Sequence, residues 1–250
     1  RSTLFPYTTL FRSQPLSMRK FKKGKLLVID GTDGSGKATQ TKLLVKNLKK
    51  HKQKVKTIDF PQYEKNFFGK MIGESLAGLN GDWVGIHPKI ASVLYAADRW
   101  ESSEKIKKWL RAGFIVVVDR YVSSNQIHQG GKVLNGKKRQ NFLNWLDKME
   151  YQIFKIPRPD IIIYLNMPID YSQKLMENPE HKAKKDYSNG KKDQHELNQQ
   201  HLENAKKSAL KMVKTNNQWV KVDCVRRGKL LERAKIADLI WRKAVKKLQI

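Results

Sequence analysis

The chain is 250 residues long and strongly basic, with 51 Lys and Arg against 23 Asp and Glu and a formal net charge of +28. Its one cysteine, Cys224, excludes an internal disulfide and fits a reducing compartment. No apolar run approaches the roughly 18 residues that a membrane-spanning helix needs, and no secretion signal is evident, so we expect a cytoplasmic protein without a membrane segment.

We exclude the N-terminal residues 1–17 from the predicted domain. Residues 3–13, TLFPYTTLFRS, match the in-frame translation of a common sequencing-adapter oligonucleotide; the alternative is a genuine extension. We expect this segment to be disordered and place a single domain at 18–250, starting at Met18. That length suits one α/β domain.

Short β-branched runs alternate with helical patterns along the rest of the chain. Strands are predicted at 25–30, 54–58, 114–119, 160–166 and 219–223. Helices are predicted at 36–50, 67–78, 88–112, 138–154, 169–177, 195–214 and 228–247. The alternation predicts an α/β fold, with a parallel sheet and helices on both of its faces.

The first predicted strand leads into GTDGSGKATQ at 31–40, a glycine-rich turn followed by a helix. Glycines let the backbone approach phosphate oxygens, and the N–H groups at a helix start favour an anion. Lys37 would bridge the β- and γ-phosphates of a nucleotide. The expected ATP-binding residues are Gly31, Thr32, Asp33, Gly34, Ser35, Gly36, Lys37, Ala38 and Thr39.

Ala38 stands where such loops have Ser or Thr, whose hydroxyl binds Mg²⁺. The phosphate cradle is made of backbone, so it survives this change, and water can take the missing place on the metal. We therefore expect weakened or water-mediated Mg²⁺ binding rather than a dead site.

Asp119 ends the third predicted strand, at the edge where ligands bind in open α/β sheets, and Arg120 follows it. The carboxylate could serve the metal through water, and the guanidinium could serve phosphates. A purely structural Asp–Arg pair is the alternative.

The segment 177–194 is polar and rich in lysine, including Lys182, Lys184 and Lys185. Its composition fits an inert insertion and a lid over anionic ligands equally well. The lysines elsewhere are scattered, which favours a solvated basic surface over a nucleic-acid-binding face, so nucleic acid is not an expected partner.

Several motifs, in family order, together resemble the thymidylate kinase family: GTDGSGKATQ, TIDFPQY, LYAADRW, DRYVSSNQIHQGG and PRPDIIIYLN. The resemblance implies a P-loop NTPase fold with five parallel strands, a homodimer, and phosphoryl transfer from ATP to dTMP with Mg²⁺. It assigns residues to the substrate as follows: Asp33 to the deoxyribose 3′-hydroxyl, Tyr63 to the acceptor phosphate, Arg120 to a clamp that spans the donor and acceptor phosphates, Tyr95 and Arg99 to the base, and Ser124 and Asn125 to the surroundings of the base and its polar edge.

The chain departs from the family pattern at its catalytic arginine, which relatives carry in the phosphate loop or in the lid. Gly34 occupies the loop position, and 177–194 contains no arginine. We therefore expect one or more of Lys182, Lys184 and Lys185 to act on the phosphates, although lysine lacks the planar fork of arginine. His128 stands near a family tyrosine and could be a plain pocket-wall residue.

Other functions stay open at this point. One is a nucleotide kinase with a different monophosphate acceptor. Another is a P-loop ATPase stimulated by nucleic acid, which the basic charge would fit. A third is a nucleotide-binding remnant that has lost catalysis.

Overall fold

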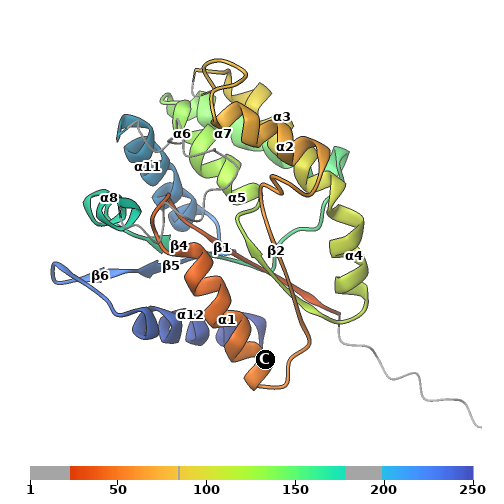
Figure 1. Ribbon diagram of the computed structural model, residues 1–250, viewed down its shortest axis with the longest axis vertical. Helices are drawn as coiled ribbons and strands as arrows, with labels where there is room; N and C mark the ends of the chain where they lie inside the picture. Colours follow the sequence, from red (N-terminus) through yellow and green to blue (C-terminus); the bar gives the residue numbers. More distant parts are fainter. Residues whose placement is uncertain (1–22, 84, 178–198, 250) are drawn as a thin grey trace, which may run out of the picture.

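The computed structural model describes residues 23–83, 85–177 and 199–249. Five strands form one parallel sheet in the order β2-β3-β1-β4-β5, which crosses the centre of Figure 1. Their bounds are β1 (Lys25–Asp30), β2 (Val55–Asp59), β3 (Ile115–Asp119), β4 (Ile161–Asn166) and β5 (Trp219–Asp223). The predicted fold class is confirmed, and each predicted strand lies within one residue of its observed bounds.

The helices connect the strands and extend beyond them. The α-helices are α1 (Lys37–Lys50), α2 (Phe67–Leu76), α3 (Pro88–Glu101), α4 (Ser103–Arg111), α5 (Val122–Ser124), α6 (Gly130–Lys132), α7 (Gly136–Asp147), α8 (Ile169–Glu177), α11 (Gln199–Thr215) and α12 (Arg233–Leu248). Two π-helical segments, η1 (Asn125–Gln129) and η2 (Lys148–Ile153), continue α5 and α7.

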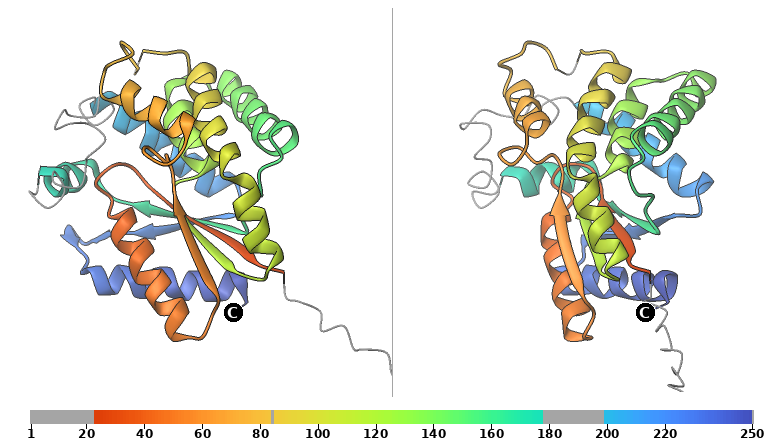
Figure 2. Two further views of the ribbon diagram at one scale, coloured as in Figure 1. Left: turned by 45° about the vertical axis from the view of Figure 1, so that its right-hand side comes forward. Right: turned by 90° about the vertical axis from the view of Figure 1, so that its right-hand side faces the viewer.

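Helices cover both faces of the sheet, and the two cores are divided by the alternation of side chains along each strand. In β1, Leu26 and Val28 join a cluster that includes residues of α3, α4, α7 and α11. Leu27 and Ile29 join the opposite cluster with residues of α1 and α12. Figures 1 and 2 show α1 and α12 together on one side of the sheet, with the larger helical layer on the other.

β2 is an edge strand of this sheet. Three of its residues, Lys56, Thr57 and Asp59, are exposed, whereas Ile58 is buried. The Lys56 ammonium lies 6.0 Å from the ring centroid of Trp109 and 5.3 Å from that of Phe114.

Two predicted helices were wrong in detail, and one helical segment was not predicted. The predicted helix 88–112 is divided at Ser102 into α3 and α4, as a serine that favours helix ends allows. The predicted helix 228–247 begins only at Arg233, because Arg227 and Gly228 have φ of 50° and 69° and close a hairpin between β6 (Val225–Arg226) and β7 (Lys229–Leu230). Residues 122–132, without a predicted helix, form α5, η1 and α6.

Candidate active site

The glycine-rich turn connects the carboxyl end of β1 to the start of α1, as predicted. Gly34 and Gly36 have φ of 73° and 85°, a backbone conformation that glycine adopts without strain. Lys37 is buried and folds back over the loop, donating to the carbonyl oxygens of Gly31 at 3.1 Å and Thr32 at 2.9 Å. Its ammonium lies 3.7 Å from Asp33 Oδ1, so the loop and its lysine form one compact unit.

The loop has features that fit a bound phosphate chain. The hydroxyls of Thr32 and Ser35 are buried without a hydrogen-bond partner among the described residues. A Cβ built on Gly36 would meet no atom within 4 Å, so there is room beside the backbone. Burial lowers the pKa of Lys37, and the nearby Arg120 lowers it further, whereas the Asp33, Asp119 and Asp30 carboxylates oppose both effects. An anion placed here would likewise favour the charged lysine.

Arg120 lies against the same loop, coming from the end of β3. Its φ is 64°, and its N–H donates to Ile29 O at 3.0 Å, which turns the chain back toward β1. Its guanidinium pairs with Asp33 and lies 4.0 Å from Asp30 Oδ1. Burial by itself would lower the pKa of Arg120, but Asp33, Asp30 and Asp119 raise it above the ordinary value, so this side chain stays a cation.

Asp119, the predicted metal residue, ends β3 beside Arg120. Burial raises the pKa of Asp119 to about 6, although Lys37 and Arg120 act in the opposite direction. The residues that the structure describes contain no group of three or more His, Cys, Asp or Glu side chains that could hold a metal ion. A cation here would therefore take most of its ligands from water and from a nucleotide.

Asp30 is a residue of this site that the sequence analysis missed. It is fully buried at the end of β1; Oδ1 accepts from Gly31 N at 2.8 Å, and Oδ2 accepts from Ser123 Oγ at 2.5 Å and Ser124 Oγ at 2.9 Å. The available signal was a carboxylate ending an apolar strand directly before the glycine loop. The hydroxyl of Ser124, expected near the base, is engaged with Asp30, which ties the segment after β3 to the phosphate loop.

Arg99, which the resemblance assigns to the base, is buried and is therefore not the surface arginine that was its alternative. It is 2% exposed and forms a two-pronged pair with Glu150, which is itself 0% exposed; Nε lies 3.0 Å from Oε2, and Nη2 contacts Oε1. Nη1 points at Tyr121 O at 3.4 Å. Of the five N–H donors of a guanidinium, these bonds use three, so among the described residues one donor on each Nη group remains.

Glu150 also holds Asn125, and this second link was invisible in the sequence. Asn125 Nδ2 donates to Glu150 Oε1 at 3.0 Å and to Ser92 O at 3.1 Å. Both partners accept hydrogen bonds, one being a backbone carbonyl and the other a carboxylate paired with the Arg99 guanidinium, so the NH₂ group of the amide faces them. The amide therefore keeps its carbonyl oxygen for another partner.

The aromatic residues predicted to contact the substrate gather between α2 and α3. Tyr63 and Tyr95 both pack against the cluster formed by Ile72, Leu76, Trp83 and Ala91. The Tyr95 hydroxyl accepts from Trp83 Nε1 at 3.2 Å, and the two rings meet edge to face at 6.1 Å. Tyr63 is close enough to Arg120 to raise its pKa, so the structure brings these two predicted phosphate-side residues together.

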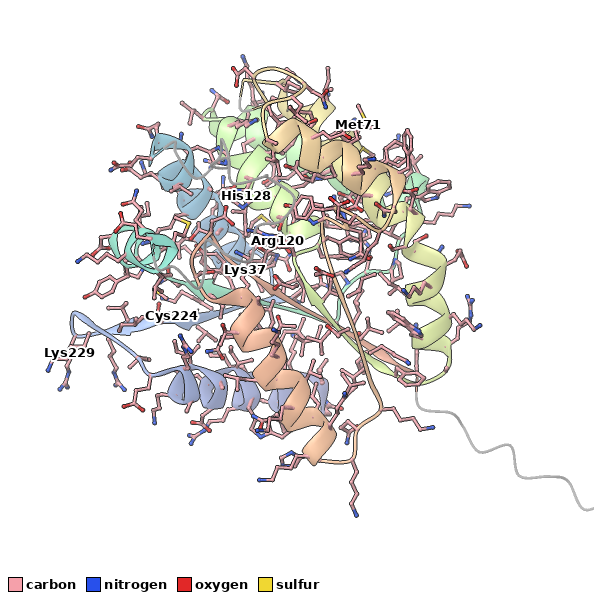
Figure 3. The ribbon with its side chains drawn as sticks, viewed as in Figure 1. Lys37, Met71, Arg120, His128, Cys224 and Lys229 are labelled. Carbon is pink, nitrogen blue, oxygen red and sulfur yellow. The ribbon has the colours of Figure 1, made fainter. Side chains whose placement is uncertain are left out.

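His128 links Arg120 to the helical layer. Its Nε2 lies 3.4 Å from Arg120 Nη1, and its Nδ1 lies 3.3 Å from His201 Nε2 on α11. Figure 3 shows His128, Arg120 and Lys37 close together, whereas Lys229 lies far away at the tip of the β6–β7 hairpin.

Some predictions fall outside the described residues. Lys182, Lys184 and Lys185, with almost all of the expected lid 177–194, lie there, and so do residues 1–17. Their roles stay predictions. Within the described chain, no helix is long and apolar enough to cross a membrane.

The comparisons with known proteins agree with this geometry. A family model described as thymidylate kinase matches residues 29–227. The thymidylate kinase of Plasmodium falciparum is 37% identical over 152 residues, 61% of this chain and 66% of that protein. The human thymidylate kinase is 28% identical over 148 residues, 59% of this chain and 63% of that protein. The matches thus span slightly less than two thirds of these curated relatives.

A solved structure of thymidylate kinase from Candida albicans superimposes with a TM-score of 0.68 and 22% identity, covering 90% of this chain and 93% of that chain. At that identity the likeness shows a common fold. Because the family model extends from within β1 to the β6–β7 hairpin, the chain belongs to the thymidylate kinase family.

Proposed function

We propose that this protein transfers the γ-phosphoryl group of ATP to dTMP, giving ADP and dTDP. The observation that carries the proposal is the meeting of Lys37, Asp33 and Arg120 at the glycine loop. A donor phosphate on the loop and an acceptor phosphate on Arg120 would then lie within reach of each other. The mapping of both nucleotides onto these residues is supported by the family's activity.

The chemistry requires little more than alignment and charge neutralisation. Backbone N–H groups of the loop bind the donor phosphates, and Lys37 turns from the Gly31 and Thr32 carbonyls to the phosphate oxygens. Arg120, which stays a cation, aligns the acceptor phosphate. Asp33 holds Arg120 in place and, as the family resemblance implies, would accept from the deoxyribose 3′-hydroxyl. No covalent intermediate on the protein is needed.

Mg²⁺, when bound with the nucleotide, neutralises charge on the transferring phosphates. Asp119 would hold it through water, and the nucleotide phosphates and further waters would supply the other ligands. Ala38, at the first turn of α1, is exposed and contributes no ligand. The raised pKa of Asp119, about 6, predicts that this residue must lose a proton before it can assist a cation.

The base side fits a pyrimidine that carries a proton on N3. The amide of Asn125 is turned by Glu150 and Ser92 so that its carbonyl is the remaining group. Arg99 retains N–H donors for a carbonyl at position 4. Thymine and uracil offer N3–H and O4, whereas cytosine offers an acceptor and an amino group in those places. This polarity favours dTMP over dCMP.

The test measures ADP formation from ATP and Mg²⁺ with dTMP, dUMP, ribo-TMP, dCMP, dGMP and AMP, using protein that starts at Met18. Highest turnover with dTMP would support the proposal. A strong preference for a purine monophosphate would indicate another nucleotide kinase. ATP hydrolysis that rises with added DNA or RNA, without transfer to any monophosphate, would indicate a nucleic-acid-stimulated ATPase.

We propose further that two copies pair through α2 and α3. Large apolar side chains are exposed on these helices: Phe67 73%, Met71 42%, Ile90 64%, Val93 43% and Trp100 52%. Ile90, Val93 and Trp100 follow helical spacing along one face of α3. A second copy is the natural partner for such a face in an enzyme family expected to dimerise. Light scattering should give twice the chain mass, and Val93→Glu with Trp100→Glu should give the monomer.

The cytoplasm is the proposed location. Its support is the single cysteine, Cys224, which is fully buried and whose pKa burial raises to about 12. Such a thiol is neither a disulfide partner within this chain nor a reactive group. Fluorescence imaging of the tagged protein checks this proposal.

A further inference from the structure

Two histidines connect α11 to the arginine of the candidate site. His128, in η1, and His201, in the first turn of α11, lie with their rings nearly parallel, at 17° and 5.5 Å between centroids. His128 Nδ1 is 3.3 Å from His201 Nε2, and His128 Nε2 is 3.4 Å from Arg120 Nη1. These two contacts form a continuous series of hydrogen bonds from α11 through His128 to the Arg120 guanidinium.

The chemistry of arginine determines the direction of every bond in this chain. A guanidinium only donates, so His128 Nε2 has to be an unprotonated acceptor. A neutral imidazole then carries its proton on Nδ1, and that proton is donated to His201 Nε2. His201 Nε2 is therefore also unprotonated. Both rings are neutral and both hold their proton on Nδ1.

The surroundings of His201 agree with a neutral ring. It is 6% exposed, and burial lowers its pKa to about 4, with Lys132 lowering it further and Asp33 opposing. At neutral pH the ring is available as an acceptor throughout. Protonation of either ring would remove an acceptor and break the chain.

The backbone that carries the two rings is firmly held. Ser208 Oγ on α11 donates to Gln126 O of η1 at 2.8 Å. A Cβ on Gly131 would lie 2.9 Å from the backbone nitrogen of Ala205, so η1–α6 and α11 are packed backbone to backbone. The two rings thus have little freedom to follow Arg120 if the guanidinium moves, and His128 holds its Nη1 while Asp33 holds its Nη2.

We propose that His201 is a positioning residue for phosphoryl transfer. It acts through His128 to hold the Arg120 guanidinium in the orientation in which it pairs with Asp33. This inference rests on the proposed function, in which Arg120 binds the acceptor phosphate. Without an acceptor at position 201, the proton of His128 can move to Nε2, where it points at a cation. The guanidinium then loses its contact with His128 and keeps those with Asp33 and Asp30.

Two variants separate this role from simple packing. His201→Phe preserves a ring beside His128 but removes the acceptor, and His201→Gln places an amide oxygen near the position of Nε2 but removes the ring. We expect His201→Phe to lower kcat/KM for dTMP about tenfold, mainly through KM for dTMP, with KM for ATP within about twofold of wild type. His201→Gln should stay within about threefold. The reverse order, Phe active and Gln impaired, would overturn the relay and leave a packing role.

A measurement on the wild-type protein decides the matter without any variant. Nitrogen-15 NMR of the imidazoles at pH 7.5 should show both rings neutral with protons on Nδ1. An Nε2–H tautomer or an imidazolium at either position would overturn the inference. Failure of wild-type protein to phosphorylate dTMP would instead refute the proposed function, while wild-type activity retained by His201→Phe would refute only the relay.

Discussion

Gly34 occupies the phosphate-loop position at which the family resemblance implies a catalytic arginine, unless that arginine lies in the lid, and the structure gives a steric reason for the glycine. A Cβ at this position would lie 2.3 Å from Ser172 O and 2.8 Å from Met176 Cγ, both on α8. The backbone oxygen cannot rotate away, so any side chain at position 34 has to displace α8. Gly36, two residues later, provides the matched control, because its Cβ would meet nothing within 4 Å.

We predict that Gly34→Ala destabilises the protein clearly more than Gly36→Ala. Both positions have positive φ, 73° and 85°, so alanine at either carries left-handed strain of about 1–2 kcal/mol. Only Gly34→Ala adds the overpacking against α8, which typically costs about 1–3 kcal/mol. The free energy of unfolding should therefore fall by about 2–5 kcal/mol for Gly34→Ala and by about 1–2 kcal/mol for Gly36→Ala.

Urea unfolding of nucleotide-free protein, followed by circular dichroism, measures both losses under conditions where phosphate binding plays no part. Equal losses, within about 0.5 kcal/mol, would refute the steric explanation. In that case α8 would yield to a side chain, and the absence of arginine from the loop would need another cause. Gly34→Arg, expected to be less stable still, extends the same test to the family residue.

Three further predictions concern the metal, the base side and pH. Ala38→Ser should lower the Mg²⁺ concentration for half-maximal activity several-fold, since a hydroxyl replaces water as a ligand; an unchanged Mg²⁺ titration would count against water-mediated binding. Glu150→Gln should lower the free energy of unfolding by about 3 kcal/mol, because Arg99 loses its buried counter-charge. The same change should weaken the preference for dTMP over 5-methyl-dCMP, because the Asn125 amide becomes free to turn. The control Asp98→Asn, which alters another buried carboxylate, should keep that preference. Burial lowers the pKa of His201 to about 4, below the unfolded value of about 6.5, so the unfolded state takes up a proton first as pH falls. The free energy of unfolding should therefore fall by up to about 3 kcal/mol between pH 6.5 and pH 4. The free energy from urea unfolding should depend less on pH for His201→Gln than for wild type, and an equal dependence would contradict the assignment.

The fold could be predicted largely because its strands are buried on both faces. Runs such as 114–119 and 160–166 consist almost entirely of β-branched and other apolar residues, and this signal is local. The β6–β7 hairpin was missed because a helical pattern continued into 228–232 and Arg227 gives no hint of positive φ. The break at Ser102 is equally weak in sequence, since serine is common inside helices as well as at their ends.

The site divides in the same way. The phosphate loop, Asp119 and Arg120 are contiguous with strands and could be found from spacing alone. Asp30 was missed although it ends a strand directly before the loop. Glu150 and His201 could not be found, because their importance comes from contacts between distant parts of the chain, such as Glu150 with Asn125, 25 residues apart, and His128 with His201, 73 residues apart. Arg99 likewise is buried and paired with Glu150, and the sequence around Arg99 does not reveal this burial.

The charged side chains of β2 have a consequence for how copies of this protein behave in concentrated solution. An edge strand offers unpaired N–H and C=O groups to any extended segment, including the same strand of another molecule. The Lys56 ammonium, which lies over the rings of Trp109 and Phe114, keeps a positive charge at this edge, and that charge repels the same strand of a second molecule. Part of the +28 charge thus protects an exposed edge strand against aggregation by strand pairing between molecules.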